Sequence, residues 1–76
     1  SYPEAAQAYA MAIQAFPLAL ESRNNLAYLL ATRPEVLQPE KAVELANDTL
    51  AQAGGADDGS FTDTLATALL AAGRMD

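Results

Sequence analysis

The feature that most constrains this chain is a short internal repeat rich in leucine and alanine. The segment Leu26-Ala27-Tyr28-Leu29-Leu30 recurs as Leu65-Ala66-Thr67-Ala68-Leu69, and the two copies begin 39 residues apart. In each copy polar residues precede a Leu-Ala pair, and a further leucine follows one helical turn later. A fixed period of this length is typical of proteins in which one supersecondary unit is stacked on the next. The repeat therefore predicts two equivalent helices within a stacked architecture.

The first half of the chain is predicted to form two helices, because apolar residues recur at spacings of three and four. The first covers about residues 3–16, and a proline near its start suits the first helical turn. Its apolar stripe is Ala5, Tyr9, Ala12, Ile13 and Phe16. The second covers about residues 18–32 and ends before Arg33-Pro34, since a residue that precedes proline is pushed out of the helical region. Its stripe is Leu26, Leu29 and Leu30, with Ala27 beside it.

The second half is predicted to form two more helices, one from Pro39 to the Gly54-Gly55 pair and one over residues 60–73. The expected stripes are Ala42, Val43, Leu45, Ala46, Thr49, Leu50 and Ala53 in the third helix, and Phe61, Leu65, Ala66, Leu69 and Ala72 in the fourth. Ser60 is expected to cap the fourth helix, and Val36 and Leu37 are expected to pack against the second or third helix. No stretch alternates with a period of two, so the predicted class is all-α, with four antiparallel helices in one domain of 76 residues.

Charge and composition exclude several classes of function. Ten acidic residues against four scattered basic ones give a net charge of −6, so the chain has no basic face for nucleic acid or for an anionic membrane surface. The absence of histidine and cysteine removes the usual nucleophiles, bases and metal ligands, and we expect neither an enzyme nor a cofactor. Asp57-Asp58 is interpreted as a solvated turn. Gly54-Gly55 lacks the Lys and Ser/Thr that a phosphate-binding loop needs.

The sequence resembles the tetratricopeptide repeat, whose pattern of W-x2-L-G-x2-Y…A-x3-F…P spans about 34 residues as a helix–turn–helix. The two Leu-Ala-x-x-Leu units stand for L-G-x2-Y. The second-helix element is matched by Ala5, Tyr9, Ala12 and Pro17, and more weakly by Ala42, Ala46, Thr49 and Gly54. The chain departs from the pattern in its missing tryptophan, its lack of aromatic residues in the third helix, and its period of 39 residues. The extra residues fit in the loop after residue 33 and in the turn after residue 53.

The resemblance, which is to bacterial multi-repeat members, implies how the 76 residues divide. Residues 3–16 would be the second helix of one repeat, 18–53 one full repeat, and 60–73 the first helix of the next, in a right-handed α-solenoid. The chain is then expected to be a piece of a longer protein, in bacterial cytoplasm or periplasm. A stack needs about three repeats and polar end caps, so the isolated piece is expected to self-associate through its uncapped end helices or to be marginally stable.

The resemblance also implies a partner-binding face, because such arrays bind peptides or helices along the first helix of each repeat. The residues on that face are Glu21, Asn24, Asn25, Tyr28 and Thr32 in the second helix, and Asp63, Thr64 and Thr67 in the fourth. Side-chain amides can pair with a ligand backbone, and a tyrosine offers a flat apolar surface with a polar tip. For Asn25 and Tyr28, a role only in hydrogen bonding or packing between helices is equally compatible with the sequence. An acidic groove favours neutral or basic segments.

The expected function is that of a protein–protein interaction scaffold, which docks a partner segment reversibly on a concave face. Two other interpretations stay open. The repeats could be spacers that rigidify a longer solenoid, or they could be an accessory domain that presents substrates to an enzyme such as a glycosyltransferase. The identity of the partner is not given by the sequence.

Overall fold

Four α-helices follow one another along the chain, in the order and near the positions that the sequence predicts. The computed structural model describes residues 1–56 and 59–74. The elements are α1 (Tyr2–Ala15), α2 (Leu20–Thr32), the short 3-10 helix η1 (Pro34–Val36), α3 (Pro39–Ala53) and α4 (Ser60–Ala71). No strand occurs within these described residues. The predicted all-α class with four helices is therefore confirmed. None of the helices in this part of the chain is both long and apolar enough to cross a membrane.

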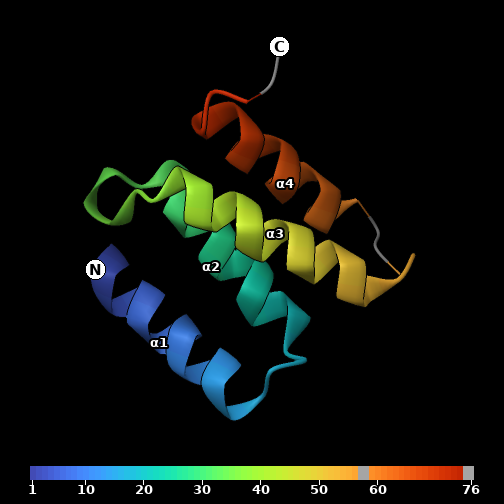
Figure 1. The fold of residues 1–76 in the computed structure, drawn as a ribbon. Helices are drawn as coiled ribbons and strands as arrows, with labels where there is room; N and C mark the ends of the chain where they lie inside the picture. The colour runs from blue at the N-terminus through green and yellow to red at the C-terminus, as the bar shows by residue number, and fades with distance from the viewer. Residues whose placement is uncertain (57–58, 75–76) are drawn as a thin grey trace.

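The helix α2 is the centre of the packing, as Figure 1 shows. It contacts α1, α3 and α4, and α3 also packs against α4. Thus α2 and α4, which carry the two copies of the repeat, are direct neighbours. The Cα atoms extend over 36 × 31 × 16 Å, which makes the molecule flat. Because packed helix axes lie about 8–10 Å apart, a thickness of 16 Å accommodates two layers of helices.

The core lies where α2, α3 and α4 meet. Its central cluster consists of Leu26, Leu30, Ala31, Ala42, Val43 and Ala68. Ala42 and Ala68 are fully buried in this cluster, and their small side chains let the helix backbones approach closely. In contrast, α1 contributes no buried residue and adds only half-buried side chains at the edge of this cluster. The molecule therefore has a three-helix core with a fourth helix laid against it.

Two sequence-predicted positions at the α1–α2 connection are corrected by the structure. Phe16 was placed on the apolar stripe of the first helix, but it is 70% exposed. The helix ends at Ala15, and Phe16 adopts φ −135° and ψ 85° because it precedes Pro17. The second helix begins at Leu20, two residues later than predicted, since the chain first turns through a hydrogen bond from the amide of Ala19 to the carbonyl of Phe16.

The loop between α2 and α3 holds one of its two apolar side chains against the core. Val36 is half-buried and packs on the central cluster, as predicted, whereas Leu37 is 49% exposed, so the prediction was wrong for Leu37. The tight turn of η1 directs consecutive side chains in different directions, and only one of them can face inward. The amide of Gln38 donates to the carbonyl of Leu30 at 2.9 Å, which ties the loop to the end of α2.

Glycines lie at the ends of α3 and α4, and the Gly54-Gly55 pair ends α3 as the sequence predicts. Gly54 is in the left-handed region at φ 61° and closes α3. At the end of α4 the amide of Gly73 donates to the carbonyl of Leu70 at 3.0 Å, and the amide of Arg74 donates to that of Leu69 at 2.9 Å. This pair of bonds satisfies carbonyls that would otherwise lack a partner within the helix. The helix α4 starts at the predicted residue 60 and ends at Ala71, two residues before the predicted end, and the prediction that Ser60 caps it is wrong, because Gly59 occupies the N-cap position and Ser60 is the first helical residue.

Two arginines hold the ends of α1. The guanidinium carbon of Arg33 lies 4.7 Å from the centre of the Tyr2 ring, near the start of the helix. At the other end, Nε of Arg23 donates to the carbonyl of Pro17 at 2.7 Å. Both arginines belong to α2 or directly follow it. The polar attachments of α1 thus lie at its two ends, while its middle rests on half-buried apolar residues.

Candidate functional site

The polar side chains that the sequence predicts as partner-binding on α2 lie on one side of that helix. We call Glu21, Asn24, Asn25, Tyr28 and Thr32 the polar stripe of α2. At 3.6 residues per turn their spacing places them together, opposite Leu26 and Leu30. Glu21 and Asn25 are exposed, and Tyr28 is 44% exposed. The polar stripe therefore offers a carboxylate, an amide and an aromatic ring to solvent on one helix face.

The residues predicted on α4 do not all join this face. Asp63 is exposed and Thr67 is half-buried, but Thr64 is only 5% exposed. The prediction that Thr64 can contact a partner is corrected by this burial. Thr64 lies on the same side of α4 as Phe61 and Ala68, which are buried, because residues three and four apart share a helix face.

The two half-buried threonines of the predicted site already have hydrogen bonds inside their own helices. Oγ1 of Thr32 donates to the carbonyl of Tyr28 at 2.7 Å, and Oγ1 of Thr67 donates to the carbonyl of Asp63 at 2.9 Å. A threonine within a helix commonly makes this bond to the carbonyl four residues earlier. The hydroxyl protons of Thr32 and Thr67 are therefore engaged, and Glu21, Asn25, Tyr28 and Asp63 remain the more accessible side chains of the face.

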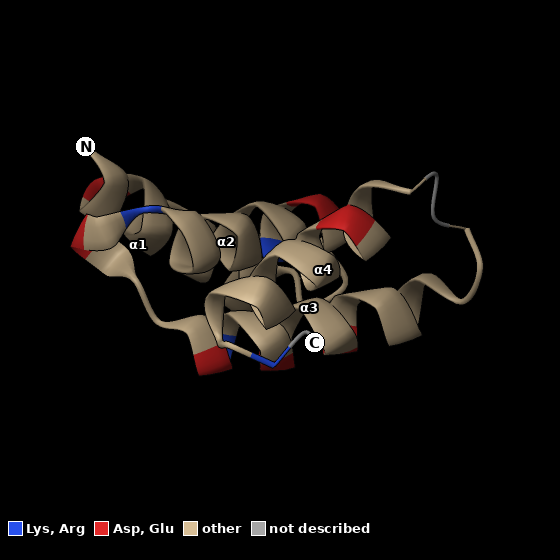
Figure 2. Cartoon of the chain, turned by 90° about the horizontal axis from the view of Figure 1, so that it is seen from above, with Lys and Arg blue, Asp and Glu red and all other residues tan. Residues whose placement is uncertain are grey.

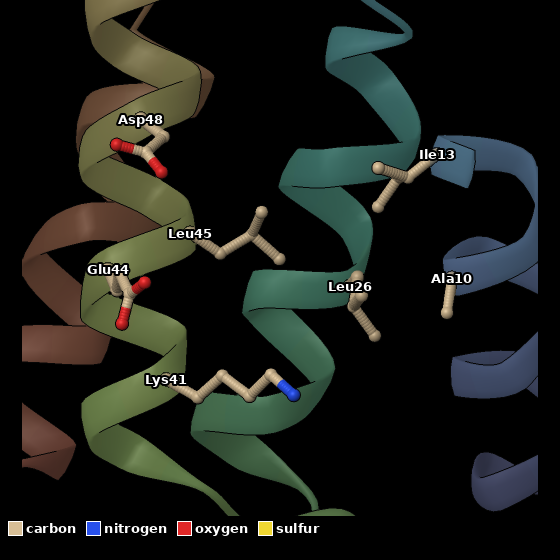
Figure 3. Close-up of a pocket in the computed structure, with 7 residues that line it drawn as sticks. All are labelled: Ala10, Ile13, Leu26, Lys41, Glu44, Leu45 and Asp48. Atoms are coloured by element: carbon tan, nitrogen blue, oxygen red, sulfur yellow. The ribbon is translucent and has the colours of Figure 1, made fainter. Parts of the chain in front are cut away.

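A groove of about 250 Å³ lies on the other side of α2, between α1 and α3. We call it the α1–α3 groove; its lining residues are Ala10, Ile13, Leu26, Lys41, Glu44, Leu45 and Asp48. Figure 3 shows Leu45 and Lys41 extending from α3 across α2, with Ile13 and Ala10 facing them from α1. The floor and the α1 side are apolar. Every charged residue of the groove belongs to α3.

The charged side chains of the groove are free of partners within the described chain. Glu44 and Asp48 are both exposed and lie one helical turn apart on α3, and neither carboxylate makes a hydrogen bond or an ion pair with a described residue. The same holds for the ammonium group of Lys41. The ion pair that the described residues do form lies elsewhere, with Nη1 of Arg74 at 2.7 Å from Oε1 of Glu40.

The described residues form neither a clustered basic surface nor a cluster of metal-ligating side chains. Figure 2 shows the basic residues separated from one another, without a clustered basic face. Within residues 1–56 and 59–74, no three side chains of His, Cys, Asp or Glu come together to hold a metal ion. The predicted acidic turn at Asp57-Asp58 lies outside the described residues.

Comparison with models of protein families, with curated proteins and with solved structures gives no match for this chain. The resemblance to the tetratricopeptide repeat therefore stays a prediction that is carried by the sequence motif.

The α1–α3 groove was missed at the level of the sequence. One signal was available, because Lys41, Glu44 and Asp48 flank Leu45 on a single face of the third helix. The other half of the groove comes from α1, which lies about 30 residues earlier in the chain. Periodicity within each helix cannot bring these two segments together.

Proposed function

We propose that this chain is a protein–protein interaction module of the tetratricopeptide type, which docks a segment of a partner on the face formed by the polar stripe of α2 and Asp63 of α4. The observation that carries the proposal is the contact between α2 and α4, the two helices that hold the repeated motif. Stacking of equivalent helices side by side is what a repeat array requires, and it produces an extended surface along them.

The side chains left accessible on that face suit the recognition of a polypeptide. Asn25 can donate to and accept from a ligand backbone, and Tyr28 can cover an apolar side chain with its ring while its hydroxyl stays hydrated. Glu21 and Asp63 place two of the chain's ten acidic residues on this face. A neutral or basic partner segment is therefore favoured.

A second function, that of a spacer within a longer helical array, is favoured by one specific observation. The hydroxyls of Thr32 and Thr67 are used inside their helices, and Thr64 is buried. Three of the eight residues predicted for the partner face thus already serve the helices themselves. Side chains that only stabilise the helices and their packing are sufficient for a spacer.

The two functions are separated by a capture experiment with a matched control. The double variant Asn25→Ala/Tyr28→Ala removes the two most informative side chains of the polar stripe. Gln7→Ala/Gln14→Ala is the control, because both glutamines are exposed on α1 and lie outside this face. The immobilised chain and both variants are exposed to a lysate, after circular dichroism has shown that all three have equal helix content.

A partner captured by the original chain and by the control, but lost by the Asn25→Ala/Tyr28→Ala variant, would establish the interaction module and its face. Equal capture by all three proteins would exclude the polar stripe as the site. Absence of any captured protein would favour the spacer. Capture is a test of the polar stripe alone, since neither variant changes a residue of the α1–α3 groove.

A further inference from the structure

We propose that the α1–α3 groove is a second docking site, which takes one apolar side chain of a basic amphipathic helix from a partner protein. This surface is distinct from the polar stripe, because Leu26 forms its floor and points to the opposite side of α2. The proposal rests on the size of the groove and on the distribution of its charges. It also rests on the spacing of the basic residues in this chain, no two of which lie three or four positions apart.

The size of the groove fits a single anchoring side chain. Its volume of about 250 Å³ is below the roughly 300–1,000 Å³ that is usual for sites of small molecules and cofactors. Leu26 of α2 forms the floor, Leu45 lies on the α3 side, and Ile13 and the small side chain of Ala10 lie on the α1 side. Protein interfaces commonly place one apolar side chain in a pocket of this kind and surround it with weaker polar contacts.

The charges of the groove lie on the α3 side only, where the carboxylates of Glu44 and Asp48 outnumber the single ammonium group of Lys41. Glu44 and Asp48 are about 6 Å apart along α3, since four residues rise by 1.5 Å each. The opposite wall, from α1, is apolar. A helix that lies in the groove would therefore present an apolar residue to the floor and two basic residues, four positions apart, to Glu44 and Asp48. Because both carboxylates lack partners among the described residues, pairing with them breaks no existing contact.

A second copy of the same 76 residues cannot supply such a helix. The basic residues are Arg23, Arg33, Lys41 and Arg74, and no two of them are three or four positions apart. A chain of net charge −6 is also repelled by its own copies, whereas a basic segment is attracted. The charge pattern therefore favours a different, basic protein as the occupant.

The probe for this proposal is a synthetic peptide of about 15 residues, long enough to be partly helical in water. It consists of alanine and glutamine, with both ends blocked so that they carry no charge. Two lysines lie four positions apart, and a leucine follows the first lysine by three positions, so that all three share one face. A control peptide carries glutamine in place of both lysines. Binding to the uniformly labelled chain is followed by the shifts of its amide resonances.

Two pairs of variants separate the contributions of charge and of the apolar floor. Glu44→Gln/Asp48→Asn removes the acidic pair, and Glu21→Gln/Asp63→Asn removes the same charge from the other face of α2 and from α4. Both double variants change the net charge by the same amount, so that long-range attraction is equal in the two proteins. Ala10→Gln fills the open side of the groove, and Ala8→Gln is its control, because Ala8 is exposed on α1 and does not line the groove.

The expected result is that the lysine peptide shifts the amide resonances of Ala10, Ile13, Leu26 and Leu45. Its dissociation constant should rise about fivefold more in the Glu44→Gln/Asp48→Asn variant than in the Glu21→Gln/Asp63→Asn variant, as expected for the loss of two exposed charge pairs in the groove. Ala10→Gln should weaken binding by a similar factor, and Ala8→Gln should not. The control peptide should bind more weakly than the lysine peptide to the original chain.

Four results would overturn the proposal. Equal weakening by both double variants would mean that only net charge attracts the peptide. Shifts centred on Tyr28 and Asn25, lost with Glu21→Gln/Asp63→Asn, would move the basic segment to the polar stripe. Shifts of the groove residues on concentrating the protein alone would make a second copy the occupant. Absence of binding up to millimolar peptide would exclude a basic amphipathic helix as the ligand of the groove.

Discussion

The helices α1 and α2 have similar lengths and are both rich in small or apolar residues, yet they are buried very differently. Four residues of α2 are buried, and none of α1 is. The difference follows from the number of neighbours, since α2 contacts three helices while α1 contacts α2 and the short η1. From composition alone, the two helices would be expected to contribute similar numbers of buried residues to the core. Burial in this molecule depends instead on having helices on more than one side.

The largest effect is expected from a substitution at the centre of the three-helix core. Leu30 is 3% exposed, and Leu30→Ala should lower the free energy of unfolding by about 2–5 kcal/mol through lost burial and a new cavity. That is a large share of the roughly 4–11 kcal/mol expected for a chain of this length. Leu70→Ala is the control, because Leu70 is 68% exposed and should change stability by less than about 0.5 kcal/mol. Urea unfolding followed by circular dichroism measures both, and equal losses would contradict the assignment of the core.

Truncation of an apolar side chain of α1 to alanine should lower the free energy of unfolding by less than truncation of Leu30. Ile13 is half-buried against the core cluster, so Ile13→Ala should lower the free energy of unfolding by about 1 kcal/mol. Met11, which is 62% exposed on the same helix, provides the control variant Met11→Ala. A loss at Ile13 as large as the loss at Leu30 would show that α1 belongs to the core, and the contrast drawn between the two helices would then fail.

A smaller and more local effect is expected where Arg33 covers the ring of Tyr2. A cation over an aromatic ring contributes about 0.5–1 kcal/mol when exposed, and Arg33→Ala removes it. The hydrogen-bonded amides at the start of α1, from Ala5 onward, should exchange with solvent a few times faster, while those of Leu30 and Val43 keep their protection. Hydrogen exchange measured by NMR resolves the two groups. Uniform acceleration across all helices would mean that Arg33 supports the whole fold rather than one end of α1.

The smallest effect is expected at the ion pair between Arg74 and Glu40. Both side chains are largely exposed, so Arg74→Ala should change the stability by no more than about 0.5 kcal/mol in dilute buffer. The difference between the two proteins should disappear as salt is added, because exposed charges are screened. Thermal unfolding at low and high salt checks this. A loss that persists in high salt would point to the Gly73–Arg74 backbone bonds instead.

Local sequence rules predicted much of the fold. Proline and glycine fixed the helix ends to within two residues, because each acts on the backbone directly. The apolar stripe of α3 was also predicted correctly at Ala42, Val43 and Ala46, which are all buried. These features depend on residues that are close together in the chain, and periodicity is sufficient to find them.

The candidate sites were harder to predict, because they depend on which helices become neighbours. The resemblance to the repeat assigns Thr64 to the partner-binding face, although Thr64 shares a side of α4 with buried apolar residues. A small polar side chain carries too weak a signal to decide between two such environments. The α1–α3 groove could not be found at all, since Ala10 and Asp48 meet only after α1 and α3 have packed on α2.

The alanines at the closest helix contacts have a consequence for how this sequence can vary. Ala27, Ala42 and Ala68 are completely inaccessible, so a larger side chain at any of them must push two backbones apart. In a library of all single substitutions, these three positions should retain only glycine, serine and alanine. The exposed positions of α1 should accept almost every residue except proline. The distances between the helices thus depend on the smallest side chains of the core, whereas the exposed positions can change in sequence without altering the fold.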